Sequence, residues 1–160
     1  MHELPRTLKI ATVWLLLATA LFLAVQAFLA ERQRPRVSTD GMGVIELRRA
    51  PDGHFHWPAR LGGGEVDFLV DTGATRTALP QPLAERLGLP RGRAVRSSTA
   101  GGTVTGWESQ VDLELAGGLQ ARALRVTVLP DLRAPLLGMD VLSRLRFTQH
   151  DGVLRLEPPG

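Results

Sequence analysis

The chain has 160 residues with 19 Lys or Arg, 16 Asp or Glu and no Cys, and its formal charge at pH 7 is +3. The absence of Cys excludes disulfides, thiolate metal ligands and cysteine nucleophiles. Five of the basic and two of the acidic residues lie in residues 1–36, so residues 37–160 carry 14 of each sign. The isoelectric point of 10.8 therefore does not indicate a basic folded surface, and we expect no nucleic-acid partner.

An uncharged apolar segment of 21 residues runs from Ile10 to Ala30. As a helix it would be about 32 Å long, enough to cross a hydrocarbon core of about 30 Å. A cleaved signal peptide is the alternative, but its apolar core is usually about 7–15 residues and ends at a small-x-small site. This segment is longer and ends in a charged stretch. The sequence predicts a tail over residues 1–9, a transmembrane anchor over 10–30 and a linker over 31–43.

Short strands begin after the linker. Val44–Arg49 and His54–Arg60 flank Pro51-Asp52-Gly53, a turn-forming sequence, and together predict a hairpin. Glycines at 62–64 provide the next turn. His54 and His56 would lie on one face of their strand, but two histidines leave most of a coordination sphere unfilled. We therefore expect no metal site, and we expect no cofactor.

The strand over residues 66–71 runs directly into a tight turn that carries an acid. Apolar residues alternate along it, as in a strand with one buried face. Gly73 lets the chain turn at once, because it adopts backbone angles that other residues avoid. Asp71 thus lies where apolar packing ends, which is costly for a charge unless N–H or hydroxyl groups bond to it. Thr72 and Thr75 are within local reach.

A helix and three strands are predicted next. Pro at its start and Gly past its end favour a short helix over Pro82–Leu87. Residues 91–98 can be a strand, and alternating apolar residues favour strands over residues 104–115 and 119–129. The first two of these strands form a hairpin with a flexible tip at Ala100, Gly101, Gly102 and Thr103. Trp107 lies near its base, where packing in the core is favoured over lining a cleft.

The last third of the chain contains an apolar pair followed by glycine, Leu136, Leu137 and Gly138, and then a short predicted helix over Met139–Leu145. Asp140 is interpreted as structural, either as the N-cap of this helix or as a partner of Arg76 or another arginine. Val153–Glu157 is predicted as a final strand.

Three of these features match motifs of one family in the order that the family has them. Asp71, Thr72, Gly73, Ala74 and Thr75 match the Asp-Thr/Ser-Gly-Ala-Ser/Thr signature of aspartic proteases. Residues 100–103 fall where the flap hairpin lies, and residues 136–138 match the apolar-apolar-Gly strand that packs across the catalytic loop. Over residues 44–157 the chain resembles retropepsin-like (clan AA) aspartic proteases, closest to the bacterial membrane-anchored members. It departs in having Thr75-Arg76 where many retroviral members have acids, and in lacking an obvious apolar residue at the flap tip.

The resemblance implies an all-β fold, a retropepsin-like closed β-barrel or sandwich with one or two short helices, over residues 44–160. With the single transmembrane helix that precedes it, the domain would lie on the periplasmic side of a bacterial inner membrane.

The resemblance also implies an aspartic endopeptidase whose catalytic residue is Asp71, supported by the loop residues 72–75. Because the chain has one Asp-Thr-Gly, a catalytic pair requires a homodimer, with an extended peptide or protein as substrate. The terminal strands 44–49 and 153–157 are candidates for an inter-subunit sheet. The alternative function is a catalytically inactive peptide-binding or assembly module on the same fold.

Overall fold

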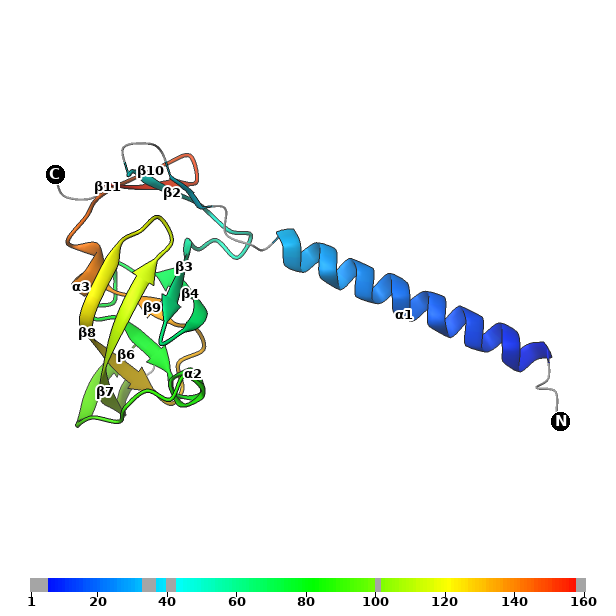
Figure 1. Ribbon diagram of the computed structural model, residues 1–160, viewed down its shortest axis with the longest axis horizontal. Coiled ribbons are helices and arrows are strands. Elements are labelled where there is room, and N and C mark those ends of the chain that lie inside the picture. The colour runs from blue at the N-terminus through cyan, green and yellow to red at the C-terminus, as the bar shows by residue number, and fades with distance from the viewer. Residues whose placement is uncertain (1–5, 33–36, 40–42, 100–101, 158–160) are drawn as a thin grey trace. The chain divides into compact units, whose positions relative to one another are not determined.

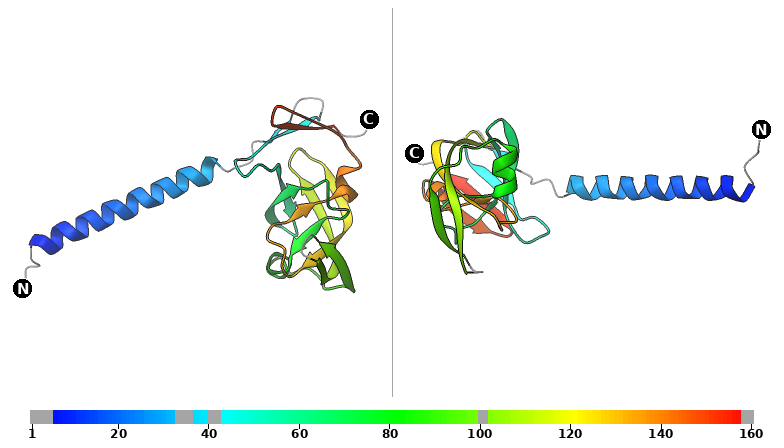
Figure 2. Two further views of the ribbon diagram at one scale, coloured as in Figure 1. Left: turned by 180° about the vertical axis from the view of Figure 1, so that it is seen from behind. Right: turned by 90° about the horizontal axis from the view of Figure 1, so that it is seen from below.

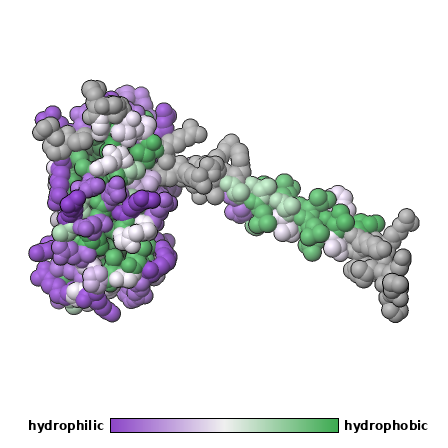
Figure 3. Space-filling model, viewed as in Figure 1, coloured by the Kyte–Doolittle hydropathy of each residue, from purple (hydrophilic) through white to green (hydrophobic). Residues whose placement is uncertain are grey.

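The computed structural model describes residues 6–32, 37–39, 43–99 and 102–157 (Figure 1). The chain divides into two compact units, residues 1–34 and 35–160. The first unit contains one helix, α1 (Arg6–Arg32), whose segment Ile10–Ala27 is apolar enough and long enough to cross a membrane. The side chains of this segment are exposed, and Figure 3 shows the apolar surface that they form. The helix fits a membrane span or a signal sequence.

The second unit is built around a seven-stranded sheet in the order β3-β4-β9-β5-β8-β7-β6. β3 also pairs with β7, so the sheet closes on itself as a barrel and β6 extends from it as the hairpin partner of β7 (Figures 1 and 2). The predicted closed β-barrel is therefore confirmed. The strands are β3 (His56–Leu61), β4 (Gly64–Val70), β5 (Ala78–Pro80), β6 (Ala94–Thr99), β7 (Gly102–Leu115), β8 (Gln120–Leu129) and β9 (Leu136–Leu137).

The barrel core is formed by the apolar side chains that alternate along the strands. Trp57 on β3 is the register partner of Phe68 on β4, and both are fully buried. On the next strands around the barrel, Val111 of β7 pairs with Leu124 of β8. The indole N–H of Trp57 donates to the backbone carbonyl of Ala116 at 2.8 Å, which satisfies the one polar atom that this large side chain carries into the core.

A second, four-stranded sheet has the order β1 (Val37–Thr39), β2 (Ile45–Arg48), β11 (Val153–Glu157) and β10 (Arg146–His150). Figures 1 and 2 show it at one end of the barrel, and its apolar side chains join the same core. Leu47 pairs with Leu154, and Ile45 pairs with Leu156. The two terminal strands expected to pair between subunits thus pair with each other within one chain, and the outer edges of this sheet belong to β1 and β10.

Several boundaries differ from those predicted. Residues 31–32 continue α1, and residues 37–39 form β1, in the range predicted as linker. The predicted helix 82–87 is observed as α2 (Gln81–Arg86). α3 (Met139–Leu142) is shorter than the predicted 139–145, because the chain turns after it to enter β10.

Candidate active site

Asp71 immediately follows the last residue of β4, and backbone groups hold it in place. The N–H of Asp71 donates to the carbonyl of Leu137 at 3.0 Å, and the carbonyl of Asp71 accepts from the N–H of Ala74 at 3.2 Å. The N–H of Gly73 donates to the carboxylate Oδ1 at 2.8 Å. The side chain is partly exposed. The carboxylate is therefore orientated by the tight turn while one side of it remains open to solvent.

The neighbouring loop residues contribute differently from what the sequence suggested. In the part of the chain that the structure describes, neither the Thr72 nor the Thr75 hydroxyl donates to the Asp71 carboxylate, and both residues are exposed. A Cβ at Gly73 would lie 3.2 Å from Asp71 Oδ1, so a larger residue there would crowd the carboxylate. The turn backbone, rather than the threonine hydroxyls, orientates Asp71 within one chain.

The loop 71–77 is fixed by a strand from the far end of the sequence. β9 lies between β4 and β5, the two strands that the loop connects, and pairs with β4 in parallel and with β5 antiparallel. Besides the bond from Asp71 to Leu137, the N–H of Met139 donates to the carbonyl of Ala74 at 2.8 Å. The predicted loop-packing residues 136–138 thus lie directly against the loop that carries Asp71.

Gly138 allows the two segments to approach closely. A Cβ on it would lie 2.5 Å from the carbonyl carbon of Arg76 and 2.8 Å from the amide nitrogen of Thr77. Real Cβ atoms do not come so near to backbone atoms, so only glycine fits without a shift of the loop.

Asp140 anchors the end of this loop. The carboxylate accepts from the backbone N–H of Thr77 at 3.0 Å on each oxygen and from its hydroxyl at 2.8 Å. The Thr77 hydroxyl in turn accepts from the N–H of Gly138 at 3.2 Å. Asp140 is therefore neither an N-cap, a position held by Gly138, nor a partner of Arg76. No local pattern in the sequence predicts this contact between residues 63 apart.

The flap prediction falls partly outside the described residues, since Ala100 and Gly101 are not among them. Gly102 and Thr103 begin β7 and pair with Thr99 and Ser98 of β6. The two strands form the hairpin expected on both sides of the tip. Trp107 of this hairpin is 4% exposed and packs in the core, with the Arg91 guanidinium 5.7 Å from its ring.

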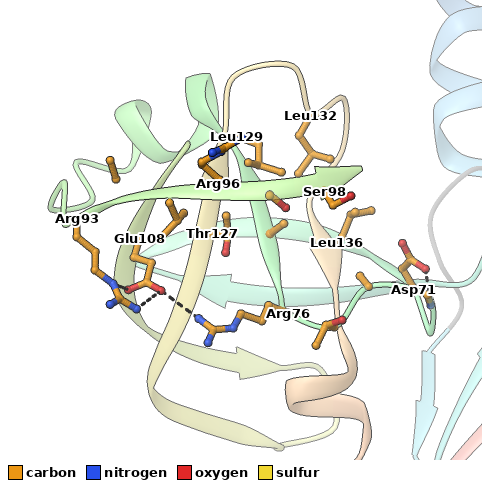
Figure 4. Close-up of a pocket in the computed structure, with 17 residues that line it drawn as sticks. Asp71, Arg76, Arg93, Arg96, Ser98, Glu108, Thr127, Leu129, Leu132 and Leu136 are labelled. Carbon is orange, nitrogen blue, oxygen red and sulfur yellow. Dashed lines mark hydrogen bonds and ion pairs between the residues drawn. The ribbon is translucent and has the colours of Figure 1, made fainter. Parts of the chain in front are cut away.

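A groove of about 1030 Å³ extends from Asp71 along the inner side of this hairpin (Figure 4). It is lined by the loop of Asp71, by β6 and by parts of β7, β8 and β9. Charged side chains line it at Arg76, Arg93, Arg96 and Glu108. Its apolar lining residues are Ala74, Ala78, Ala94, Val95, Leu129, Leu132 and Leu136.

Two arginines share one carboxylate within the groove. Arg76 Nη1 lies 3.0 Å from Glu108 Oε1, while Arg93 donates from Nε to Oε2 at 2.6 Å and from Nη2 to Oε1 at 3.0 Å. The hydrogen bond from Arg93 lowers the pKa of Glu108 below its ordinary value, and the same bond raises the pKa of Arg93. Glu108 therefore remains ionised in mildly acidic solution.

A second polar cluster supports the strand that leads to Asp71. The His56 ring bonds to Asp52 through Nε2 at 2.7 Å and to Asp67 through Nδ1 at 3.0 Å. The backbone N–H of His54 and then the His56 ring lower the pKa of Asp52, whereas partial burial raises the pKa of Asp67. In the described residues no group of three or more potential ligands is placed to hold a metal. The cluster ties the loop before β3 to β4.

Comparison with known proteins agrees with this arrangement. The family described as "gag-polyprotein putative aspartyl protease" matches residues 57–144, more than half of the chain. The chain belongs to this family, and its fold is that of the retropepsin-like aspartic proteases.

The crystal structure of a retropepsin-like aspartic protease from Rickettsia conorii is similar, with 28% sequence identity and a TM-score of 0.57, over 76% of this chain and 94% of that one. A Sinorhizobium protein described as an "uncharacterized protein in cobV 5'region" is 32% identical over 123 residues. These cover 72% of this chain and 53% of that protein, so the chain spans about half of its length. The Gag-Pol polyprotein of gibbon ape leukemia virus is 33% identical over 84 residues, 52% of this chain and 5% of that polyprotein.

Proposed function

We propose that the chain is a membrane-anchored aspartic endopeptidase, in which Asp71 is the catalytic residue and two chains form one active site. The observation that carries this proposal is the geometry of Asp71. Its carboxylate lies at the end of a groove, is orientated by the N–H of Gly73, and keeps one side exposed. An exposed and orientated carboxylate in a groove is suited to activating a water molecule against a bound peptide.

One carboxylate does not complete the chemistry. An ionised carboxylate takes a proton from water as the water oxygen attacks the peptide carbonyl carbon, and a second, protonated carboxyl donates to the carbonyl oxygen. The tetrahedral intermediate then collapses, the C–N bond breaks, and the amine leaves with a proton from the pair. Two carboxyls at close range share one proton because their charges repel, and the aspartic-protease dyad is the standard example. The sequence has one Asp-Thr-Gly, so the second carboxyl comes from Asp71 of another chain.

Two features favour pairing of chains. β10 is an edge strand whose residues are all exposed, including Phe147 at 38%, and such an edge is available for pairing with a second copy. The apolar helix within residues 10–30 would hold two copies in one bilayer and raise their effective concentration. In this proposal the membrane anchor lies within α1, and the protease domain, which begins with β1, lies on the periplasmic side of a bacterial inner membrane.

The substrate in this proposal is an extended peptide. The groove runs along the β6–β7 hairpin, whose backbone can pair with a bound strand, and the side chains of the groove then select residues of the substrate.

The test uses the full-length chain purified in a non-ionic detergent. We expect it to cleave unfolded protein at acidic to neutral pH, and Asp71→Asn to abolish cleavage without changing thermal unfolding. Mixing the inactive variant with an equal amount of active chain should lower the activity per active chain to about half, because chains that exchange form mixed dimers with one aspartate. If the activity per active chain is unchanged after the subunits have exchanged, a shared site is refuted. A folded dimer that binds peptides and never cleaves them would instead establish the inactive peptide-binding module.

A further inference from the structure

We propose that the part of the groove beyond Asp71 is a cationic subsite, formed by Arg76 and Arg93, that selects an acidic side chain in the peptide substrate. The inference rests on the proposed function and specifies its substrate class. It follows from the charge balance, the free donors and the position of these arginines.

The charges in this part of the groove do not balance. Two guanidiniums, those of Arg76 and Arg93, meet one carboxylate, that of Glu108. The Glu108 side chain is 13% exposed, whereas those of Arg76 and Arg93 are 52% and 69% exposed. A carboxylate with so little access to water needs a partner, and the two hydrogen bonds from Arg93 already supply it. Arg76 is therefore not required for the neutralisation of Glu108.

Donor groups remain available in the same place. A guanidinium has five N–H donors, and among the described residues Arg76 makes one hydrogen bond, through Nη1 to Glu108. The planar fork of an arginine matches a carboxylate, which can accept two parallel hydrogen bonds. A Glu or Asp side chain of a bound peptide would provide the missing acceptor.

The position of the arginines separates this subsite from the reacting bond. Figure 4 shows Asp71 at one end of the groove and Arg93 at the other, with Arg76 and Glu108 between them. Leu136 lies towards Asp71 in the same view, so an apolar side chain lies nearer to the carboxylate than the Arg93–Glu108 pair does. Leu129 and Leu132 lie beside Arg96, apart from Arg76 and Arg93. The preferred peptide thus has apolar residues next to the cleaved bond and an acidic residue some positions away. A two-fold dimer repeats the subsite, which predicts the preference on both sides of the bond.

The first experiment measures cleavage by the full-length chain in non-ionic detergent at pH 6. The substrates are fluorescent peptides with an apolar central pair, one outer position fixed as Glu, Gln or Lys, and the other positions randomised. We expect the best outer position on each side of the bond to favour Glu over Gln by about tenfold in kcat/KM, the lower end for a charge-assisted hydrogen bond, because the arginines are half exposed. The preference should fall below about pH 4, where the substrate carboxyl is protonated. Equal rates for Glu, Gln and Lys at every outer position would overturn the inference.

Variants then test which residues cause the preference for Glu. Arg93→Glu should change it from Glu to Lys, and Arg76→Gln should reduce the Glu/Gln ratio severalfold. Glu108→Gln should raise the ratio, because it removes the one competing carboxylate of the subsite. Arg122→Gln is the matched control, since Arg122 is an exposed arginine of β8 outside the groove. If this control lowers the Glu/Gln ratio as much as Arg76→Gln does, the preference reflects net charge and the subsite is refuted.

Binding of the same peptides to Asp71→Asn, measured by fluorescence anisotropy, keeps the inference separate from catalysis. A preference for Glu in binding supports the subsite even if no peptide is cleaved, an outcome in which only the proposed activity fails. Cleavage that depends on Asp71 without any charge preference leaves the proposed function standing and refutes the subsite.

Discussion

Removing the Asp140 carboxylate should loosen the catalytic loop. In Asp140→Ala the backbone N–H of Thr77, a residue with no exposed surface, loses its acceptor, and the hydroxyl of Thr77 loses the same partner. A buried N–H left without a partner costs about 1–3 kcal/mol, and a hydrogen bond to a charged group contributes about 1.5–3 kcal/mol. Because the two values describe the same interaction in part, they do not add in full. We therefore expect a loss of about 3 kcal/mol in the free energy of unfolding. For a barrel of this size that lowers the midpoint by roughly 10 °C.

Conservative variants separate the contributions of the charge and of the hydroxyl to this loss of stability. Asp140→Asn retains one acceptor oxygen but loses the charge, so about half of the destabilisation should remain. Thr77→Val removes the hydroxyl but keeps the backbone N–H. In the double variant Thr77→Val/Asp140→Ala the two losses should not add, with a coupling energy of about 1 kcal/mol or more. Asp131→Ala, in an exposed turn, is the matched control and should be neutral.

The assay is thermal and urea unfolding of the full-length chain in non-ionic detergent, followed by tryptophan fluorescence, with cleavage of unfolded protein measured in parallel. Asp140→Ala should reduce cleavage more than the fraction unfolded explains, because the loop that carries Asp71 loses its anchor. If Asp140→Ala unfolds within about 0.5 kcal/mol of wild type and cleaves equally well, this account of the loop is wrong.

Three further predictions use the same unfolding assay. Gly138→Ala should destabilise by about 2–3 kcal/mol, because its Cβ would lie 2.5 Å from the carbonyl carbon of Arg76 and the loop must shift; wild-type stability would contradict the close approach. The pKa of Glu108 is lowered in the folded chain by Arg93, so the carboxylate stabilises the fold above its unfolded pKa of about 4.3 and the effect is lost as pH falls through the folded value. The stability difference between wild type and Glu108→Gln should therefore shrink on acidification, and a constant difference from pH 7 to pH 3 would exclude this linkage. Trp57→Phe should cost about 2 kcal/mol through a lost hydrogen bond and a cavity, and a neutral result would show that the core repacks.

Much of the barrel could be predicted from the sequence, because its long strands bury one face and expose the other. β7 and β8 have the period of two that such strands impose, and their predicted ranges match closely. The end of β4 and the turn at Asp71 followed from local signals as well. The strand Leu136–Leu137 is too short for a periodic pattern, and only its resemblance to a family motif predicted its position.

Other elements gave no usable signal. β10 has one large apolar residue, Phe147, and all five of its residues are exposed, so it has no alternating pattern. The pairing of Glu108 with Arg76 joins residues 32 apart, and that of Asp140 with Thr77 joins residues 63 apart. Charges of both signs are spread through the sequence, so spacing alone does not select these pairs. They follow from the barrel topology, which a single sequence shows only in outline.

The topology makes the geometry of Asp71 a property of the complete barrel. The Asp-Thr-Gly turn is local, but the N–H of Asp71 is satisfied by Leu137, and the loop ends at Thr77 on Asp140. These partners come from the segment after β8, which enters between β4 and β5. A chain in which residues 135–140 have not docked contains the motif without a fixed carboxylate, since the loop backbone then has water as its partner. Orientation of Asp71 therefore depends on closure of the barrel, and its chemistry in the proposed enzyme depends further on a second, equally closed barrel.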